Sequence, residues 1–501
     1  MPEQRRTTKH VARPPRLCWA LTAITLAALL VLWGLVLGTR LAPALYLAAL
    51  LAAAALAAGL VFLLTRDAAH RGHVAGGCVL TALAVAGSLA GGFYLWRTVH
   101  AVRTVSDTAV ERARVSFYTL QDSPAATLED LASGTFGVLK ELDRSNTDIT
   151  LQQAQEEHGL TLAVTRYDSL IDLADALQSG AVDAIVLNEA YLTLYEETPG
   201  YEKFPSRLKT ISTRQVEHVV EVEPAESQAQ EDSVINILIS GSDTRENTID
   251  QRGRSDVNII ASINTETHQT LLLSTPRDYF VPLDVGVDDA YDKLTHAGIY
   301  GMDVLMGTLE NLYGIDIDYY FRINFTGFVD VIDALGGIEV YSAYDFTAGG
   351  YHFTEGVNAL DGDAALAFAR ERYSFSEGDR QRGSNQMEVV KAVFQKAMSP
   401  SILTQYLSIL DSVQSCVDTS VPYDVIAELV RQQLESGASW KIESFGVNGS
   451  DARAATYSMN QDLYVMIPDE AAVAEAKDRL AAVGNEVRGQ SGATMETAPA
   501  A

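Results

Sequence analysis

The segment "SVINILISGSDTRENTIDQRGRSDVNIIASIN", residues 233–264, decides the fold. It begins and ends with a run of β-branched and other apolar residues, the composition of central strands of a sheet. The part between the two runs is dense in acids and guanidinium groups: Asp243, Arg245, Arg252, Arg254 and Asp256. A single stretch of this kind is explained equally well by a solvated loop and by a binding site. Features elsewhere in the chain are needed to decide between these two explanations.

Outward from this segment, apolar strands alternate with helical patterns. Residues 270–276 and 318–325 read as strands. Helical patterns follow at 298–314, where Gly314 ends the helix, and at 326–337, 360–372 and 383–398. Such alternation predicts an α/β fold, an α-β-α layered sandwich, over residues 230–488. The last residues, 489–501, are predicted to be disordered.

Residues 97–229 predict a smaller α/β domain with its linker. The stretch "TLEDLASGTFGVL" is typical of a short helix before a strand, and "YDSLIDLADALQSGAVDAIVLN" of a helix that stops at Gly180 before another strand. The polar run 221–232 marks a linker. This segment shows no cluster of convergent polar groups, so we favour a spacer or a partner-docking module over a ligand pocket.

Three stretches without charged residues, 17–39, 41–65 and 72–96, are each long enough to cross a bilayer. Arginine and lysine concentrate before the first stretch and between the second and third. The positive-inside rule therefore predicts a cytoplasmic tail, residues 1–16, three transmembrane helices within 17–96, and everything after Trp96 outside the cell membrane.

The formal charge of −28 is unevenly distributed. Residues 1–96 carry eight Lys/Arg and two Asp/Glu, a net +6, so the remaining chain carries −34. An acidic exterior part argues against nucleic acid as a partner. Cys18 and Cys78 lie in the apolar stretches, which leaves Cys416 as a lone cysteine, better explained as a small buried side chain than as a nucleophile.

Further charged clusters follow other strands and helices in this acidic chain. They are Arg277 with Asp278, Lys293 with His296, Arg370 with Arg372, and Asp379, Arg380, Arg382, Asn385 and Gln386. Arginines gathered at the ends of apolar elements predict a shared pocket for a phosphate-rich anion, because the guanidinium fork matches two phosphate oxygens. The neighbouring aspartates Asp243 and Asp256 are candidate ligands of Mg²⁺ or Mn²⁺, which prefer carboxylates together with phosphate oxygens.

Several dispersed motifs, in order, resemble the LytR–CpsA–Psr family. They are "GSDTRENTIDQRGRSD", "PRD", "DKLTHAG", "IDALGG", "LDGDAALAFARER" and "GDRQRGSNQ". The three spans and the extra small domain are most similar to the capsule-type branch of that family. One departure is Asn385-Gln386, where many members have an Arg-Gln pair.

The resemblance implies a cell-wall glycopolymer transferase that is anchored in the membrane. It implies polyprenyl-diphosphate-linked polymer (capsular polysaccharide or a teichoic-acid-like chain) as donor, peptidoglycan as acceptor, Mg²⁺ or Mn²⁺ as cofactor, and capsule-synthesis proteins as further partners. The metal ligands it implies are Asp243 and Asp256. The diphosphate ligands it implies are Arg254, Arg277, Lys293, Arg370, Arg372, Arg382 and Gln386, with Asp379 ordering the arginines.

Two alternatives stay open: a phosphatase that hydrolyses the lipid diphosphate, and a non-catalytic membrane regulator of envelope synthesis. Asp278 and Asp379 are both candidates for the base that deprotonates the acceptor hydroxyl. Apolar residues of 298–314 and 319–325 are expected to form core for the most part, and some of them to line a channel for the isoprenoid tail.

Overall fold

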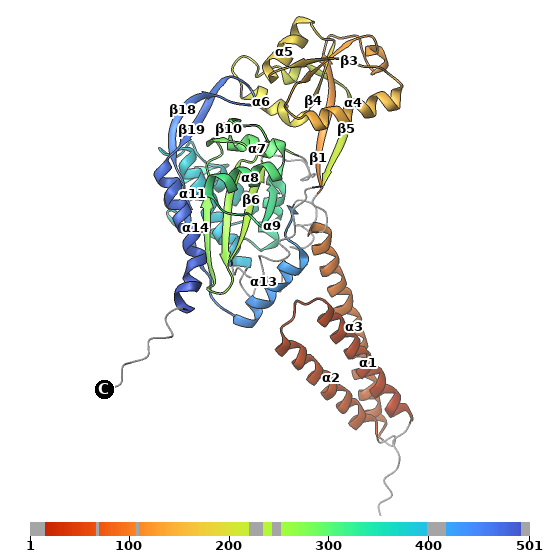
Figure 1. Ribbon diagram of the computed structural model, residues 1–501. Helices are drawn as coiled ribbons and strands as arrows, with labels where there is room; N and C mark the ends of the chain where they lie inside the picture. The colour runs from red at the N-terminus through yellow and green to blue at the C-terminus, as the bar shows by residue number, and fades with distance from the viewer. Residues whose placement is uncertain are drawn as a thin grey trace, which may run out of the picture. The chain divides into compact units, whose positions relative to one another are not determined.

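The computed structural model describes residues 16–66, 70–106, 110–219, 234–242, 252–397 and 417–491. They form two compact units (Figure 1), one made of Met1–Arg103 and Pro422–Ala438, the other of Thr104–Val421 and Ser439–Ala501. The predicted linker 221–232, Asp243 and Cys416 lie outside the described residues.

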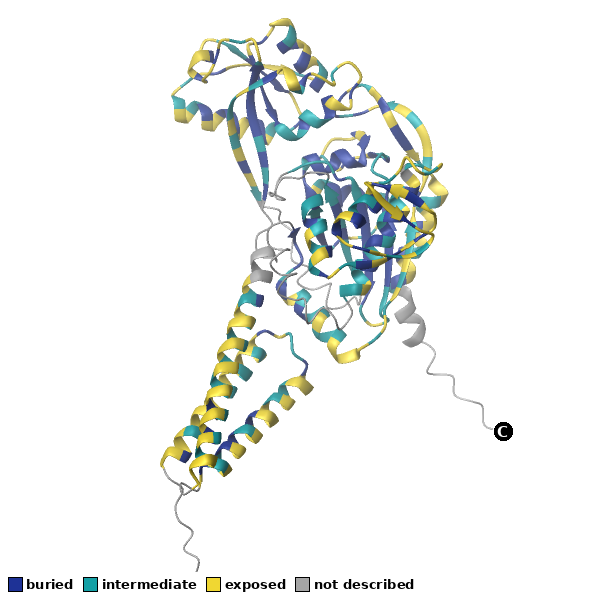
Figure 2. Ribbon diagram, turned by 180° about the vertical axis from the view of Figure 1, so that it is seen from behind, coloured by how far each residue is buried: buried dark blue, intermediate teal, exposed yellow. Residues whose placement is uncertain are grey.

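Three apolar helices make up most of the first unit: α1 (Arg16–Gly38), α2 (Ala44–Thr65) and α3 (Arg71–Ser106). Each is long and apolar enough to cross a membrane, which confirms the three predicted apolar helices. Most of their side chains are exposed (yellow in Figure 2), as expected of surfaces that face lipid. The hydroxyls of Thr25 and Thr81 pair at 3.0 Å between α1 and α3, which satisfies polar groups that lipid cannot.

A fourth helix of the first unit, α13 (Tyr423–Ser436), comes from far along the chain. The Tyr423 hydroxyl donates a hydrogen bond of 2.9 Å to the carbonyl of Thr39, just after α1. Asp424 lies 3.7 Å from Arg40. The chain therefore passes from one unit to the other at three points, after Arg103, Val421 and Ala438.

In the second unit, the first sheet has the order β3-β2-β4-β1-β5. Its strands are β1 (Val110–Leu120), β2 (Thr135–Leu139), β3 (Ala163–Tyr167), β4 (Ala184–Asn188) and β5 (Leu208–Val219). The helices are α4 (Arg144–His158), α5 (Leu170–Ser179) and the one-turn α6 (Leu192–Glu196). Gly180, at φ 74°, ends α5 as predicted, and apolar cores lie on both faces of the sheet. The predicted small α/β fold is confirmed.

The second sheet is mixed and has the order β16-β11-β6-β7-β8-β17. Its strands are β6 (Val234–Ser242), β7 (Val257–Asn264), β8 (Gln269–Ser274), β11 (Tyr319–Asn324), β16 (Val417–Thr419) and β17 (Lys441–Gly446). Strands β6, β7 and β8 are antiparallel, so the opening segment forms a pair of neighbouring strands. β11 runs parallel to β6, and β17 parallel to β8.

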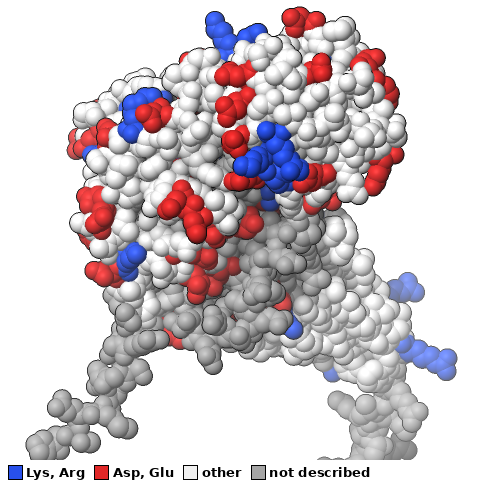
Figure 3. Space-filling model, turned by 45° about the horizontal axis from the view of Figure 1, so that its top comes forward, with Lys and Arg blue, Asp and Glu red and all other residues white. Residues whose placement is uncertain are grey.

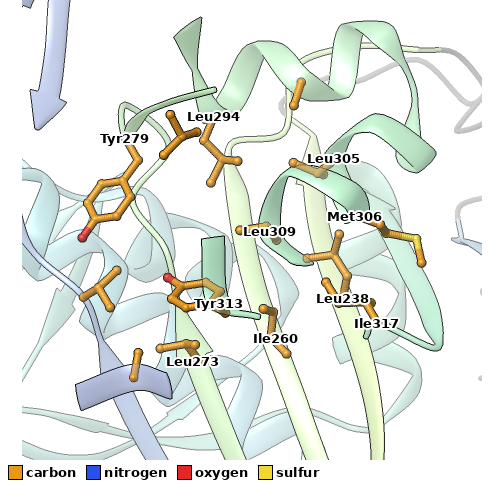
Figure 4. Close-up of a cluster of buried hydrophobic side chains, with 14 of the residues drawn as sticks. Leu238, Ile260, Leu273, Tyr279, Leu294, Leu305, Met306, Leu309, Tyr313 and Ile317 are labelled. Carbon is orange, nitrogen blue, oxygen red and sulfur yellow. The ribbon is translucent and has the colours of Figure 1, made fainter. Parts of the chain in front are cut away.

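Helices cover both faces of this sheet. One face packs on α7 (Leu294–Tyr300), α8 (Met302–Tyr313) and α14 (Glu470–Ser491). Figure 4 shows this core, where Ile260 of β7 meets Leu309 of α8. The preceding residue, Ile259, points to the other face, which packs on α11 (Asp379–Ala397). Each such fully buried side chain contributes about 1.5–3 kcal/mol. The predicted α-β-α layering is confirmed.

Smaller elements complete the unit. On the α11 side, α9 (Phe325–Ala334) and α10 (Gly362–Arg370) share a separate apolar core with α11. Among the described residues, four two-stranded antiparallel pairs accompany the sheet: β9 (Phe280–Pro282) with β10 (Tyr291–Lys293), β12 (Ile338–Ser342) with β15 (Gly356–Leu360), β13 (Phe346–Ala348) with β14 (Tyr351–Phe353), and β18 (Gly449–Ala455) with β19 (Asp462–Pro468).

Three differences from the predicted bounds affect the helices around the site and the end of the chain. The helical pattern 298–314 belongs to two helices, α7 and α8, because Gly301 adopts φ 143°, which no α-helix accommodates. Helix α11 begins at Asp379, four residues earlier than the predicted 383, so Arg382 lies on the helix and not ahead of it. Helix α14 continues to Ser491, three residues into the segment predicted to be disordered.

The two sheets of the second unit meet at a buried charge network. The carboxylate of Glu111, on β1, accepts hydrogen bonds from Arg322 of β11 at 2.9 Å and from Arg252 at 3.1 Å. Arg322 also donates to Asp418 of β16 at 2.6 Å. Glu111 is fully buried and Arg322 is 4% exposed. Charges this deeply buried are stable only because each has opposite partners.

Candidate functional site

The backbone between β6 and β7 is held in place where the described residues resume. The amide of Asp256 donates to the carbonyl of Gly241 at 2.8 Å, and that of Ser255 to the carbonyl of Thr295 at 3.1 Å. Helix α7 approaches so closely that a Cβ on Gly298 would lie 2.6 Å from the carbonyl oxygen of Gly253. Arg254 and Asp256 therefore project from a backbone fixed by both β6 and α7.

Arg277, just after β8, reaches the same place from a different strand. Its carbonyl accepts from the amide of Thr295 at 2.8 Å, which fixes the backbone. One guanidinium nitrogen lies 2.6 Å from Oδ1 of Asp256, and another 3.2 Å from Oε1 of Glu197, the residue after α6. The side chain of Arg277 is only 14% exposed, so these contacts are largely shielded from water.

Lys293, the last residue of β10, completes a group of three cations. Its ammonium lies 3.1 Å from Asp278 and 3.9 Å from Glu197. Arg254 also pairs with Oε1 of Glu197. We call Arg254, Arg277 and Lys293 the cation cluster. Burial alone would raise the pKa of Glu197, but the charges of Arg254, Arg277 and Lys293 outweigh it and hold that pKa below its ordinary value.

A cavity of about 200 Å³ opens beside the cation cluster. Asp256 and Arg277 line it on the cluster side, and Arg382 and Gln386 line it from the first turns of α11. Four residues apart on one helix, Arg382 and Gln386 share a face. Other lining residues include Asn258, Ser274, Thr275, Arg380, Ser384 and Asn448, so the walls are polar.

A second, smaller cavity of about 80 Å³ lies on the α11 side of the sheet and is almost wholly apolar. Its walls come from β6, β7, β11, α9, α10 and α11: Ile239, Val257, Ile323, Phe325, Phe328, Leu366, Ala369, Val389 and Val390. Gln386 lines both cavities. Arg370 lines the apolar one, with its guanidinium 4.5 Å from the centre of the Phe325 ring.

The chain has a formal net charge of −28, and acidic side chains are frequent on the face that Figure 3 shows. In Figure 3, Asp and Glu side chains are scattered over the described surface, whereas Lys and Arg gather in a few groups. Against that background, several arginines around one polar cavity form a local site for an anion.

Residues 201–482, more than half of the chain, match the LytR_cpsA_psr family. The chain belongs to this family.

Curated relatives in the LytR_cpsA_psr family carry one descriptive name, polyisoprenyl-teichoic acid–peptidoglycan teichoic acid transferase TagU. The protein of that name from Halalkalibacterium halodurans is 37% identical over 238 residues, which cover 47% of this chain and 74% of that protein. The one from Oceanobacillus iheyensis is 34% identical over 248 residues, 48% of this chain and 73% of that protein. The crystal structure of TagV from B. subtilis shares 28% identity and a TM-score of 0.43, covering 51% of this chain and 98% of that one.

The structure brings together most, but not all, of the residues that the resemblance to the LytR_cpsA_psr family implied. Arg254, Arg277 and Lys293 all contact Glu197, and Arg277 also contacts Asp256. Arg382 and Gln386 share the polar cavity with Arg277 and Asp256. Arg370 lies at the neighbouring apolar cavity. Arg372 lies on the surface, where its guanidinium contacts the Tyr373 ring. Asp379 begins α11, and its side chain, like all of Asp243, lies outside the described residues.

Neither of the two cavities is lined by residues 298–314, some of which were expected to line a channel. Side chains of α8 such as Leu305 and Leu309 pack in the core on the other face of the sheet (Figure 4). Of the residues 319–325, Ile323 and Phe325 line the apolar cavity, and the remaining wall comes from β6, β7, α9, α10 and α11.

Two charged features of the site were missed. Glu197 lies in the small α/β domain, 57 positions before Arg254, and no local pattern marks it. Asp292 was also missed, although its partner His296 had been named: the two form a buried pair at 2.7 Å beside Lys293. The neighbouring His296 charge lowers the pKa of Asp292 against the effect of burial, which keeps that carboxylate ionised.

Proposed function

We propose that this protein transfers a polyprenyl-diphosphate-linked glycopolymer, a teichoic-acid-like or capsular polysaccharide, to peptidoglycan by phosphotransfer. One observation carries the proposal: the cation cluster adjoins the polar cavity through Arg277, and Gln386 lines both that cavity and the apolar one. A lipid diphosphate has this division into charged and apolar parts. Membership of the LytR_cpsA_psr family and the transferase names of its relatives support the same reaction.

The positively charged residues serve to bind the two phosphoryl groups and to offset their charge. Arg277, which follows β8, and Arg382 of α11 both line the polar cavity, so a diphosphate bound there would be held by two guanidiniums. The first carbons of the isoprenoid tail would continue past Gln386 toward Phe325 and Phe328. Phosphoryl transfer depends mostly on such positioning and charge neutralisation.

In the reaction, an oxygen of a peptidoglycan hydroxyl bonds to the phosphorus attached to the polymer. The bond from that phosphorus to the bridging oxygen breaks, and polyprenyl phosphate leaves with the electron pair. The hydroxyl proton passes to a base, for which Asp278 and Asp379 are the candidates. Asp278 lies 3.1 Å from Lys293, beside the cation cluster, which supports its candidacy.

We propose Mg²⁺ or Mn²⁺ as the cofactor, held by Asp256 and Asp243. Asp256 lines the polar cavity and accepts hydrogen bonds from Arg277 and Thr295. Asp243 follows Ser242, the last residue of β6, whose neighbour Gly241 pairs with Val257. Within the described residues no group of three or more His, Cys, Asp and Glu is arranged around an ion. One or two carboxylates together with phosphate oxygens suffice for Mg²⁺, which would neutralise charge on the diphosphate.

The three apolar helices anchor the protein in a membrane, and we propose that the site lies outside the cell. Basic residues before α1 and between α2 and α3 support a cytoplasmic N-terminus. An exterior site would face both a lipid-linked donor and the wall. Accessibility of a single introduced cysteine at the exposed Glu217 to an impermeant thiol reagent in whole cells tests this topology.

The test of function is a reconstituted reaction. The full chain in detergent is incubated with lipid-linked saccharide, Mg²⁺ and peptidoglycan oligomers. Saccharide phosphate appearing on the oligomer supports transfer. Its release into solution at the same rate with and without the oligomer would favour the phosphatase, and no turnover would favour the regulator.

A further inference from the structure

Glu197 stands apart from the other carboxylates around the cation cluster. Asp256 lies just before β7 and Asp278 after β8, so both belong to the part of the chain that forms the second sheet, as does Arg277, which they contact. Glu197 belongs to the first sheet's domain, where it directly follows α6. It is therefore a charge that one domain contributes to a site built on the other.

The carboxylate of Glu197 has the contacts that a phosphoryl group would need. Its Oε1 is shared by the guanidiniums of Arg254 and Arg277, and its Oε2 lies 3.9 Å from the ammonium of Lys293. Two oxygens shared among three cations are the arrangement in which arginine and lysine bind phosphate. With its pKa held below the ordinary value of 4.5, Glu197 is ionised at neutral pH.

A bound diphosphate needs the same cations. Arg277 lines the polar cavity and also contacts both Asp256 and Glu197, so its donors are engaged before any ligand arrives. A phosphoryl group that binds these cations would lie close to the carboxylate of Glu197. Both groups are negatively charged, so they would repel each other. The Glu197 side chain is 30% exposed and follows a helix of a single turn, so it can leave the cluster without unpacking the core.

We propose that Glu197 is an internal carboxylate that the diphosphate of the donor must displace from the cation cluster, and that it thereby sets the affinity of the site. The inference rests on the proposed function in that it takes the ligand to be a diphosphate. It assigns the small α/β domain a direct part in substrate binding, through one side chain.

The test measures binding without any acceptor, so that turnover is not needed. Geranyl diphosphate is titrated into the full chain in detergent, with Mg²⁺ present, for the wild type and for E197Q. Removal of the competing charge is expected to lower the Kd on the order of tenfold. E196Q is the matched control: Glu196 is the preceding residue, is exposed, and has no ion pair among the described residues, so its Kd should equal that of the wild type.

A second variant, E197A, removes the same carboxylate without placing an amide near the arginines, and it is expected to tighten binding as E197Q does. Unchanged or weaker binding by both variants would overturn the inference, and weaker binding would show that Glu197 assists the ligand. If the wild type and all variants fail to bind geranyl diphosphate, both the inference about Glu197 and the proposed function are contradicted. Equal and measurable binding by the wild type and all variants would contradict the role of Glu197 but not the proposed function.

Discussion

The guanidinium of Arg322 lies 2.9 Å from the carboxylate of Glu111, although the two residues are 211 positions apart and belong to different sheets. Both side chains are buried, and Glu111 also contacts Arg252 and the amide of Met302. The small α/β domain is thus joined to the larger one by an ionic contact without water around it. Such a contact is strong only while both charges are present.

Glu111→Gln is therefore expected to destabilise the protein by about 3 kcal/mol, the lower end of what removing one partner from a buried pair costs, since Arg322 keeps Asp418. Thermal unfolding of the full chain in detergent measures the change. Glu217→Gln is the control, because Glu217 pairs with Arg112 on the same sheet but is 62% exposed. Its effect should stay within about 1 kcal/mol. Equal shifts for the two variants would mean that the buried network stabilises the protein no more than an exposed ion pair does.

The positions of Arg277 and Arg372 predict very different effects on transfer. Arg277 lies in the polar cavity, so Arg277→Ala should lower the rate about 10²–10³-fold, as loss of one charge-stabilising donor does. Arg372 contacts Tyr373 on the surface, and Arg372→Ala should change the rate less than about threefold. Initial rates in the reconstituted reaction decide between them. A loss at Arg372 as large as that at Arg277 would contradict the geometry described above.

The pKa of Glu197 makes part of the stability depend on pH. A carboxyl whose pKa is lower in the folded state stabilises the fold above its unfolded pKa, and this stabilisation is lost as pH falls through the folded value. The wild type should therefore unfold at a higher temperature than E197Q at pH 7, and the gap should close as the pH falls below the ordinary value of 4.5. Melting curves from pH 7 to pH 3 measure the gap. A constant gap would exclude ionisation of Glu197 as its cause.

The apolar cavity should select for the isoprenoid part of the ligand. Ala369→Leu adds three carbons to a buried position that lines this cavity of about 80 Å³. We expect it to weaken binding of geranyl diphosphate about tenfold while binding of inorganic pyrophosphate stays the same, because only the first ligand has a tail. Competition between the two ligands measures both affinities. Equal weakening of the binding of both ligands would mean that the isoprenoid tail does not occupy this cavity.

The proposed role of Asp256 as a metal ligand predicts how binding of the diphosphate depends on the divalent cation. If Asp256 holds Mg²⁺, the wild type should bind geranyl diphosphate more tightly with Mg²⁺ than with EDTA, by about tenfold or more. Asp256→Asn should remove most of that difference, since an amide is a poorer ligand than a carboxylate. Titrations with and without the cation give both ratios. A full Mg²⁺ effect in the variant would exclude Asp256 as a ligand.

The layered fold could be predicted because its signals are local. The apolar runs at β6 and β7 and the glycine stops at Gly180 and Gly314 lie within a few residues of the elements they define. The break at Gly301 was missed because a glycine inside an apolar helical pattern does not reveal its φ. What decides there is tertiary: a Cβ on Gly301 would lie about 3 Å from Glu111 and Arg252.

The candidate site, like the fold, could be predicted only in part from the sequence. Arginines at the ends of strands could be assigned to one pocket, since the resemblance to a family supplied their partners. Glu197 could not, because its role depends on where α6 lies relative to β8, and no short stretch of sequence records that relation. Arg372 failed to join the cavity for a related reason: α10 ends at Arg370, and the chain beyond it leaves the helix.

The return of the chain to the membrane unit at α13 has a mechanical consequence. The second unit is joined to the first by peptide bonds at three places, and Tyr423 and Asp424 hold the returning helix to the turn after α1. Tension applied to the second unit is therefore shared among three covalent connections.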